Sequence, residues 1–226
     1  MSTLSDLQAK NPHIKIHSVT DPEFKSYGRL LPEAKWDAAQ AHARKVWKVE
    51  DSIGADVSVP EFEADKDLDA TISQRIYGQM PVEVGWVYGR NSMLNALEYH
   101  QGSEVHMPLE DVVFLVYKFE DIDWTPDPMI DTTKLKAFFC PKGTVTELAG
   151  WALHYVPVHV HEHLGFCDIF TLPKGSGTSL TSPKPDTPDG KLMVAKNQWV
   201  IAHPDFKDSG CVSGMKGPNV KINPLD

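Results

Sequence analysis

Cysteine is scarce in this chain, which has only Cys140, Cys167 and Cys211 among its 226 residues. Three widely spaced cysteines do not suit a disulfide-stabilised scaffold, and they favour a reduced, cytoplasmic protein. Cys140 and Cys167 lie in apolar runs, so we expect them to be buried as small hydrophobic residues rather than to act as reactive thiols.

Long hydrophobic runs are also missing, and basic residues are outnumbered. No apolar segment approaches the roughly 20 residues that a membrane-spanning helix needs, and the N-terminus lacks the basic and apolar stretches of a secretory signal. Lys and Arg total 22 against 31 Asp and Glu, a net charge of −9 that argues against nucleic acid as the main partner. Hydrophobic residues make up 41% of the chain, which is enough for a packed core. Since nucleic acid and membrane are not expected as partners, we expect a small-molecule substrate.

The first 80 residues predict a partly helical extension. A proline after Asp21 and a glycine at 28 are typical of a short helix, and the Ala-rich stretch from 32 to 47 favours a second. Residues 67–77, followed by Gly78, favour a third. The acidic segment 49–66, between the second and third predicted helices, is expected to be an exposed connection with few strand residues.

Residues 82–202 predict a β-barrel. Short β-rich runs alternate there with glycine and proline turns, as in an antiparallel sandwich or barrel. The runs are 84–88, 94–100, 104–107, 112–119, 134–140, 145–148, 152–160, 166–172 and 197–202. Residues 173–191 are rich in Pro, Gly, Ser and Thr and predict a long loop or lid over one end. Residues 203–226 look like an irregular tail, so the whole chain, 1–226, is expected to be one mainly β domain.

The segment 96–106 carries four potential metal ligands, Glu98, His100, Glu104 and His106. All four stand at even positions, and alternate side chains of a strand share one face. A strand pair that turns near 101–102 would aim several of them at one point. Imidazole and carboxylate together suit one divalent transition metal ion, such as zinc, nickel, iron or manganese.

A second set of candidates, Glu147 and His154, follows the Pro-Lys-Gly turn at 141–143. In a barrel, strands that are distant in sequence can converge. With the first cluster, this pattern resembles the cupin superfamily. Cupins carry two His and a Glu in a first motif and a further His in a second, and hold one metal inside a double-stranded β-helix, the jelly roll. Here the order His100, Glu104, His106 departs from the usual His-x-His followed by Glu. The resemblance also implies a homodimer.

Two narrower resemblances agree with the similarity to the cupin superfamily. The stretch 97–108 is similar to a signature of ureidoglycolate lyases, with His100, Ser103 and Pro108 matching, while Glu104 and His106 replace Gln and Phe. The chain also resembles an uncharacterised cupin-like family of bacterial proteins, which has Asn at the position of His106. The matching segments are 11–13, 24–29, 91–100, 103–104, 153–155 and 172–175. Their spread implies one domain with N-terminal helices packed against the barrel.

The resemblance implies a two-His-one-carboxylate set made by His100, Glu104 and His154, with His106 or Glu147 as a fourth group. Either Glu147 or Glu98 is a candidate general base. For Glu98, an outward-pointing side chain and a supporting contact to a ligand are equally compatible interpretations. The metal would polarise a carbonyl. We therefore expect an isomerase or epimerase of a small sugar or keto acid. The alternatives are a C–N lyase like ureidoglycolate lyase, and a non-catalytic metabolite-binding cupin.

Other histidines and aromatic residues favour simpler interpretations. Alternate histidines at 159, 161 and 163 resemble a chelating strand, but a solvated hairpin end suits this run better. Aromatic and Met side chains at strand spacing line a pocket less often than they fill a core. Five such residues could line a pocket, but are expected to fill the core instead: Met80, Trp86, Tyr88, Tyr117 and Trp151.

Overall fold

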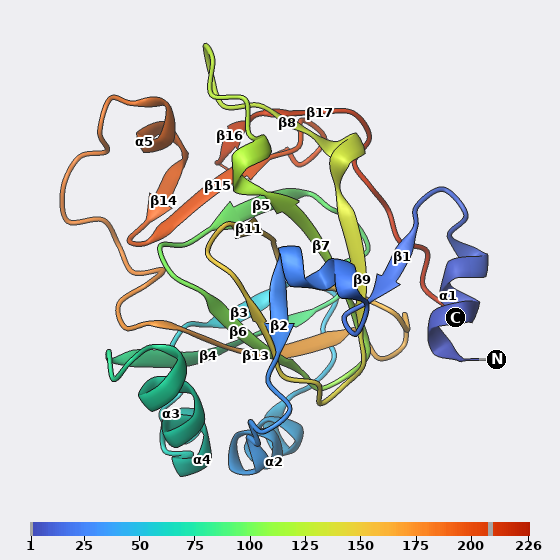
Figure 1. Cartoon of the computed structure of the whole chain (residues 1–226), viewed down its shortest axis with the longest axis vertical. Helices are drawn as coiled ribbons and strands as arrows, with labels where there is room; N and C mark the ends of the chain where they lie inside the picture. Colours follow the sequence, from blue (N-terminus) through green and yellow to red (C-terminus); the bar gives the residue numbers. More distant parts are fainter. Residues whose placement is uncertain (1, 208–209) are drawn as a thin grey trace.

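The computed structural model describes residues 2–207 and 210–226. Within these residues the chain is mainly β, as the sequence predicts, and its two largest sheets face each other across a buried core (Figure 1). No helix among them has the length and apolar content to cross a membrane.

A six-stranded antiparallel sheet forms one layer. Its strands, in spatial order, are β2 (Gly28–Leu30), β10 (Thr146–Leu148), β6 (Glu104–Pro108), β13 (Phe166–Pro173), β4 (Val82–Gly89) and β3 (Gly54–Asp56). The longest pairing joins β13 to β4 over their full lengths. Because β6 lies between β10 and β13, its side chains are held from both sides.

A five-stranded sheet forms the facing layer. Its strands are β1 (Ile16–Ser18), β9 (Lys136–Cys140), β7 (Val112–Lys118) and the short β11 (Ala152–Leu153) and β12 (Val158–His159), which both pair with β7. The central strand β7 is buried on both faces, which explains its nearly unbroken hydrophobic sequence.

Apolar side chains from both sheets fill the space between them. Strand alternation sends every second side chain inward. The six-stranded sheet contributes Val87, Leu148, Phe166, Phe170 and Leu172, and the five-stranded sheet contributes Val112, Phe114, Val116, Phe138 and Cys140. Cys140 and Cys167 are both fully buried, as expected.

The N-terminal extension supplies helices to the outer face of the six-stranded sheet (Figure 1). Asp65 joins two of these helices, because its carboxylate accepts hydrogen bonds from the amide of Ala39 in one and from the amides of Asp67 and Leu68 in the other. The helices of this part of the chain are α1 (Thr3–Lys10), the 3-10 helix η1 (Pro22–Ser26), α2 (Asp37–Val46), α3 (Pro60–Glu63), α4 (Lys66–Leu68) and the π-helix η2 (Asp69–Ile76).

A third sheet lies beside the two layers. It contains β14 (Met193–Ala195), β15 (Gln198–Ala202), β16 (Val212–Ser213) and β5 (Ala96–Tyr99), which pairs with β15. A small parallel pair joins β8 (Ile130–Asp131) to β17 (Met215–Lys216). The remaining helices are η3 (Phe119–Asp121), η4 (Thr132–Lys134) and α5 (Pro188–Leu192).

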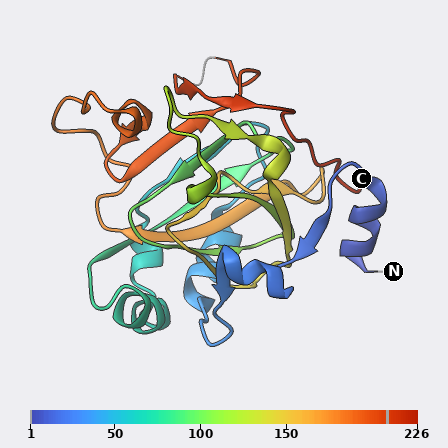
Figure 2. The same cartoon turned by 45° about the horizontal axis from the view of Figure 1, so that its top comes forward.

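The two ends of the chain lie on the same side of the molecule, as both views show (Figure 2). The side chain of Asn11, at the end of α1, bonds both the carbonyl and the amide of Asn223. Val220 and Ile222 insert into the core on the outer face of the five-stranded sheet. The C-terminal segment is therefore part of the packed structure.

Several local expectations differ from the structure. The connection 49–66 contains strand β3 and helix α3, and the expected tail 203–226 contributes β16 and β17. The run 152–160 is split into β11 and β12, because Pro157 cannot donate a ladder hydrogen bond. In the described ranges no sheet closes on itself, so the closed jelly-roll barrel stays a prediction.

Candidate metal centre

Strand β6 points Glu104 and His106 into the space between the sheets. Val105 and Met107, at the alternate positions, pack on the outer face against the N-terminal helices. The predicted sharing of one face by Glu104 and His106 follows from this alternation. Both side chains are buried, with residue exposures of 6% and 3%.

His100 reaches the same place from the corner that follows β5. We expected β5 and β6 to pair through a turn near Gly102, but β5 pairs with β15 and β6 with β10 and β13. The chain therefore crosses from one sheet to another at this corner. Asn197 holds the corner, because its carbonyl is 2.7 Å from Nδ1 of His100 and its side-chain oxygen accepts the amide hydrogen of Gln101.

His154 is positioned by a short antiparallel bridge to Glu98. The amide of each residue donates to the carbonyl of the other, over 2.6 Å and 3.1 Å. Directly opposed residues in an antiparallel pair place their side chains on the same face. This bridge therefore brings the second sequence cluster, 50 residues downstream, to the first.

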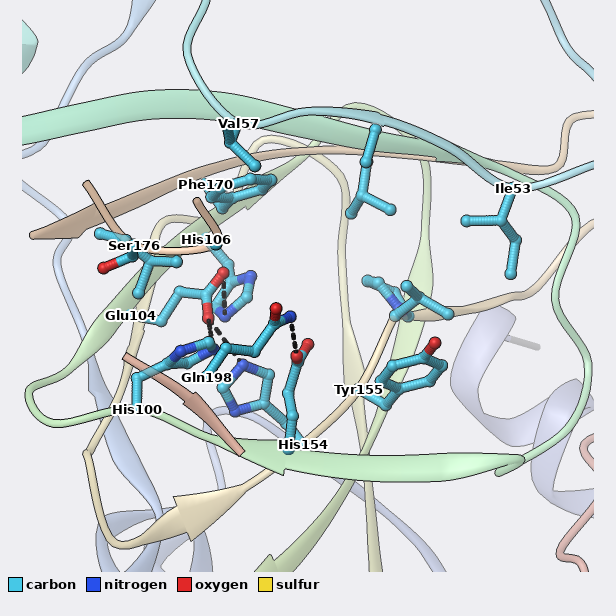
Figure 3. A pocket seen from close by; sticks show the side chains of 17 residues that line it. Ile53, Val57, His100, Glu104, His106, His154, Tyr155, Phe170, Ser176 and Gln198 are labelled. Atoms are coloured by element: carbon cyan, nitrogen blue, oxygen red, sulfur yellow. Dashed lines mark hydrogen bonds and ion pairs between the residues drawn. The ribbon is translucent and has the colours of Figure 1, made fainter. Parts of the chain in front are cut away.

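Three imidazoles converge on the carboxylate of Glu104 (Figure 3). Oε2 of Glu104 lies 2.8 Å from Nε2 of His154 and 3.1 Å from Nε2 of His100. Oε1 lies 4.0 Å from Nε2 of His106. The structure thus brings together the four residues that the sequence offers as metal ligands.

Each of these histidines has its other ring nitrogen bound outside the cluster. Nδ1 of His106 is 2.7 Å from Oδ2 of Asp168, and Nδ1 of His154 is 3.1 Å from the carbonyl of Ala152. His100 uses the carbonyl of Asn197 in the same way. A carbonyl only accepts, so Nδ1 of His100 and of His154 carries hydrogen. Metal-binding histidines are oriented by such bonds, which leave Nε2 for the ion.

The donor set fits a divalent transition metal ion. Ligand atoms about 2.0–2.2 Å from one ion lie about 2.8–3.6 Å from their neighbours, and the Glu104 contacts to His154 and His100 fall in this range. Nε2 of His106 is buried and makes no hydrogen bond within the described structure, although it is directed at the cluster. A buried polar atom without a partner is costly, and a bound cation would satisfy it.

The electrostatics of the cluster favour cationic charge. Burial acts to lower the pKa of His100, but the hydrogen bond and charge of Glu104 outweigh it and raise the pKa to about 9. Burial acts to raise the pKa of Glu104, yet the charge of His106 and the hydrogen bonds from His100 and His154 hold that pKa well below its usual range. The cluster therefore stabilises positive charge beside Glu104, which is the charge that a metal ion would supply.

The cluster forms one wall of a cavity of about 250 Å³. Apolar side chains make most of the remaining wall, and Figure 3 shows Ile53, Val57 and Phe170 on the far side from His100. The lining residues outside the cluster are Ile53, Ala55, Val57, Val87, Glu98, Tyr155, Val156, Pro157, Phe170, Leu172, Ser176, Gly177 and Gln198. Lysine and arginine are absent from this described lining.

Glu98 also faces the cavity, beside the cluster. Its carboxylate, Nε2 or Nδ1 of His100 and a ring nitrogen of His154 offer three ligand atoms within 4.8 Å of one another. Oε2 of Glu98 accepts a hydrogen bond of 2.6 Å from the side-chain amide of Gln198 (Figure 3). This bond fixes the orientation of a carboxylate that is only partly buried.

Glu147 lies on the other face of the sheet. It stands opposite Val105 in the pairing of β10 with β6, so its side chain shares the outer face with Val105. There its Oε2 is 2.5 Å from Nε of Arg29. The structure therefore separates Glu147 from His100, Glu104, His106 and His154.

The histidine run after β12 is divided between core and surface. His159 is buried, accepts the amide hydrogen of Asn91 and contacts Glu162, a structural arrangement. His161 and His163 lie in the turn that follows, as expected for a solvated end. The aromatic and Met candidates Met80, Trp86, Tyr88, Tyr117 and Trp151 do not line the cavity.

Four residues near the centre escaped the sequence analysis: Asp168, Gln198, Tyr155 and Ser176. A carboxylate between Cys167 and Ile169 in an apolar run is a detectable signal, because a fully buried Asp needs a partner. Ser176 lines the cavity from the segment predicted as a loop or lid. Nothing in the sequence distinguishes Gln198 or Tyr155 from other strand residues.

Comparison with known proteins gives one family match. The model described as "Domain of unknown function (DUF4867)" matches residues 16–220. No curated protein matches the sequence significantly.

Solved structures of oxalate decarboxylase from Bacillus subtilis resemble part of the chain. One, a study of its Mn(II) centres, is 8% identical with a TM-score of 0.32 and covers 57% of this chain and 27% of that chain. Another, at pH 4.6, is 11% identical with a TM-score of 0.30 and covers 45% of this chain and 23% of that chain. The matches therefore span about a quarter of those longer proteins.

Proposed function

The chain belongs to the DUF4867 family, and we propose that it is a metal-dependent enzyme of the cupin type that acts on a small, oxygen-rich substrate. One observation carries this proposal. Three buried histidines, each anchored through Nδ1, direct Nε2 at the carboxylate of Glu104 on the wall of a small cavity. The two facing sheets, with two ligands on β6 and the others directly after β5 and β11, support a cupin-type arrangement.

His100, Glu104, His106 and His154 would hold the ion. Imidazole and carboxylate donors suit zinc, nickel, iron or manganese better than calcium or magnesium. When bound, the ion would supply Lewis-acid polarisation of a substrate oxygen. The open wall beside the cluster, next to Glu98, leaves room for that oxygen.

Glu98 is the residue best placed to move a proton. It lies beside the proposed metal ligands, its orientation is fixed by Gln198, and it faces the cavity. In an aldose–ketose isomerisation, its carboxylate would take the proton from the hydroxyl-bearing carbon next to the carbonyl and return it to the carbonyl carbon, while the proton of that hydroxyl moves to the carbonyl oxygen. One C–H bond and one O–H bond break and one of each forms, so the step is internally balanced. Glu147, bound to Arg29 on the other face, is not a candidate for this role.

The cavity favours an uncharged or singly charged substrate. Its lining carries the carboxylates of Glu98 and Glu104, with no lysine or arginine among the described lining residues. A phosphorylated substrate would meet negative charge without a compensating side chain. The small volume, about 250 Å³, favours a sugar or keto acid of a few carbons.

The proposal is tested with protein purified without chelator. We expect one transition metal ion per chain at the buried centre, which is lost in His154→Ala, and metal-dependent interconversion of aldoses and ketoses in a panel of short sugars. Glyoxylate release from ureidoglycolate would indicate the C–N lyase instead. Binding of panel members without turnover by the metal-loaded protein would indicate a non-catalytic cupin. Absence of bound metal after expression in media supplemented with each candidate metal would reject the metal-dependent enzyme forms.

A further inference from the structure

A second group of potential metal ligands lies where the turn after β12 meets the C-terminal segment. His161, His163 and Asp226 each offer one ligand atom, and the three atoms lie within 4.8 Å of one another. None of these residues lines the cavity beside Glu104. We propose that they form a second, solvent-accessible site for a divalent transition metal ion.

The geometry is close to that of a coordinated ion. Nδ1 of His163 and Nδ1 of His161 lie 2.6 Å and 3.1 Å from the same oxygen, Oδ2 of Asp226. Neighbouring ligands of one ion lie about 2.8–3.6 Å apart. Shifts of a few tenths of an ångström would admit the ion, and the side chains are exposed enough to make them, at 65% for His163 and 41% for Asp226.

Backbone contacts fix the carboxylate in front of the two imidazoles. The amide of Glu162 donates to Oδ1 of Asp226 over 2.8 Å, so Oδ2 is the oxygen directed at the histidines. The amide of Leu225 donates to the carbonyl of Val160 over 2.8 Å. These bonds hold the two segments in register before any ion binds, which reduces the entropic cost of binding.

The donor set defines the class of ion. Two imidazole nitrogens and one carboxylate oxygen suit zinc, nickel, cobalt or copper, whereas calcium and magnesium prefer oxygen ligands. Water would complete the coordination shell, because this site is open to solvent. We therefore expect the ion to be bound more weakly here than at the buried centre.

Glu162 lies within the same turn but is engaged elsewhere. Its Oε2 is 2.8 Å from Nε2 of His159, and its Oε1 is 3.8 Å from Nε of Arg90. It contributes its amide, not its carboxylate, to the contact with Asp226. Replacement of its carboxylate is therefore a matched control that leaves the three proposed ligands in place.

An ion at this site would clamp the C-terminal segment to the body of the protein. Ile222 in that segment is fully buried, and the amide of Asn223 is bonded to Asn11. A link from Asp226 to His161 and His163 would close the last part of the segment onto the turn. Local opening of its final residues would then become slower when the ion is bound.

The test uses the full chain without an affinity tag, stripped of metal and reloaded with Zn²⁺. We expect His163→Ala to bind one ion fewer per chain than the wild type, Glu162→Gln to bind the same number as the wild type, and His154→Ala to keep the surface ion. In hydrogen exchange, Zn²⁺ should slow the amides of Leu225 and Asp226 in the wild type and Glu162→Gln, and not in His163→Ala.

Equal zinc stoichiometry in His163→Ala and the wild type would overturn the proposal, as would loss of the ion in Glu162→Gln. His161→Ala gives an independent check, because it removes a different ligand of the same site. Complete loss of bound zinc in His154→Ala, which leaves His161, His163 and Asp226 in place, would also overturn the proposal. The proposed function of the buried centre is tested separately by turnover, so the surface site and the proposed function can each be rejected without the other.

Discussion

Nε2 of His154 lies 2.8 Å from Oε2 of Glu104, although 50 residues separate them in the sequence. Glu104 comes from strand β6, whereas His154 follows β11 and bridges Glu98, and both residues are nearly inaccessible to solvent. Nδ1 of His154 donates to the carbonyl of Ala152, so Nε2 is the nitrogen that faces the carboxylate. This contact is the centre of the proposed site, and the predictions below depend on it.

Metal affinity should rise with pH up to about pH 9. In the metal-free protein the pKa of His100 is raised to about 9, because the hydrogen bond and charge of Glu104 outweigh the opposing effect of burial. An ion that binds Nε2 must displace this proton at every lower pH. One displaced proton changes the apparent affinity about tenfold per pH unit.

Competition with a chelator of known affinity between pH 6 and pH 9 measures this dependence. Each value is corrected for the chelator's own protonation. Affinity for Zn²⁺ that stays constant across this range in the wild type would contradict the assignment of Nε2 of His100 as a ligand.

Asp168→Asn should weaken metal binding by about 10–100-fold, the usual cost of losing a partner that orients a ligand. The fully buried Oδ2 of Asp168 lies 2.7 Å from Nδ1 of His106. The amide keeps the shape of the carboxylate but loses the charge that raises the basicity of the imidazole. Asp168 is a positioning residue, and chelator competition is the measurement.

Thr171→Val is the matched control for Asp168→Asn. Thr171 is buried on the same strand, and its register opposite Val105 places it on the outer face. Its replacement should leave zinc affinity within about threefold of the wild type, since no proposed ligand contacts it. Equal affinity in Asp168→Asn and Thr171→Val would exclude the positioning role.

Comparison of Glu98→Gln with Glu147→Gln should show which of the two carboxylates transfers a proton and which has only a structural role. Glu98 faces the cavity, so its amide variant should retain the metal and lose turnover by at least 10²-fold, as expected for a general base. Glu147 pairs with Arg29, which is 61% exposed, so its variant should retain activity and lose less than about 1 kcal/mol of stability. The measurements are kcat on the substrate found in the panel and urea unfolding. The opposite pattern would make Glu147 the base.

Much of the centre follows from the sequence, because alternation along a strand is a local property. Even spacing predicts that Glu104 and His106 share a face, and the structure places both on the inner face of β6. The mainly β class follows from the short apolar runs and their turns. The convergence of His154 on the first cluster follows only from the resemblance to cupins, since no local pattern links segments 50 residues apart.

Strand register limits what the sequence can predict for Glu147. A shift of one residue between β10 and β6 would exchange its face with that of Thr146 or Leu148. The apolar and polar residues of this short strand do not specify which face is buried, since all three are buried. Gln198 is missed for a related reason, because its role depends on the pairing of β15 with β5.

Glu104→Gln should destabilise the metal-free protein at pH 7 by about 3–5 kcal/mol, the usual cost of breaking a buried ion pair. The variant leaves His100 and His154 facing a neutral amide in a buried site. The folded-state pKa of His100 is raised above its usual value. Its contribution to stability is therefore complete below about pH 6.5 and is lost as the pH rises through about 9.

The difference in unfolding free energy between the wild type and Glu104→Gln should therefore shrink from pH 6 to pH 10. Urea unfolding in the presence of a chelator measures it. Glu120→Gln, at a side chain that is 75% exposed, controls for the loss of one carboxylate and should change stability by less than about 0.5 kcal/mol. A gap that stays constant or grows with pH would show that Glu104 stabilises the fold by packing alone, because only a charge interaction with the histidines disappears when they lose their protons.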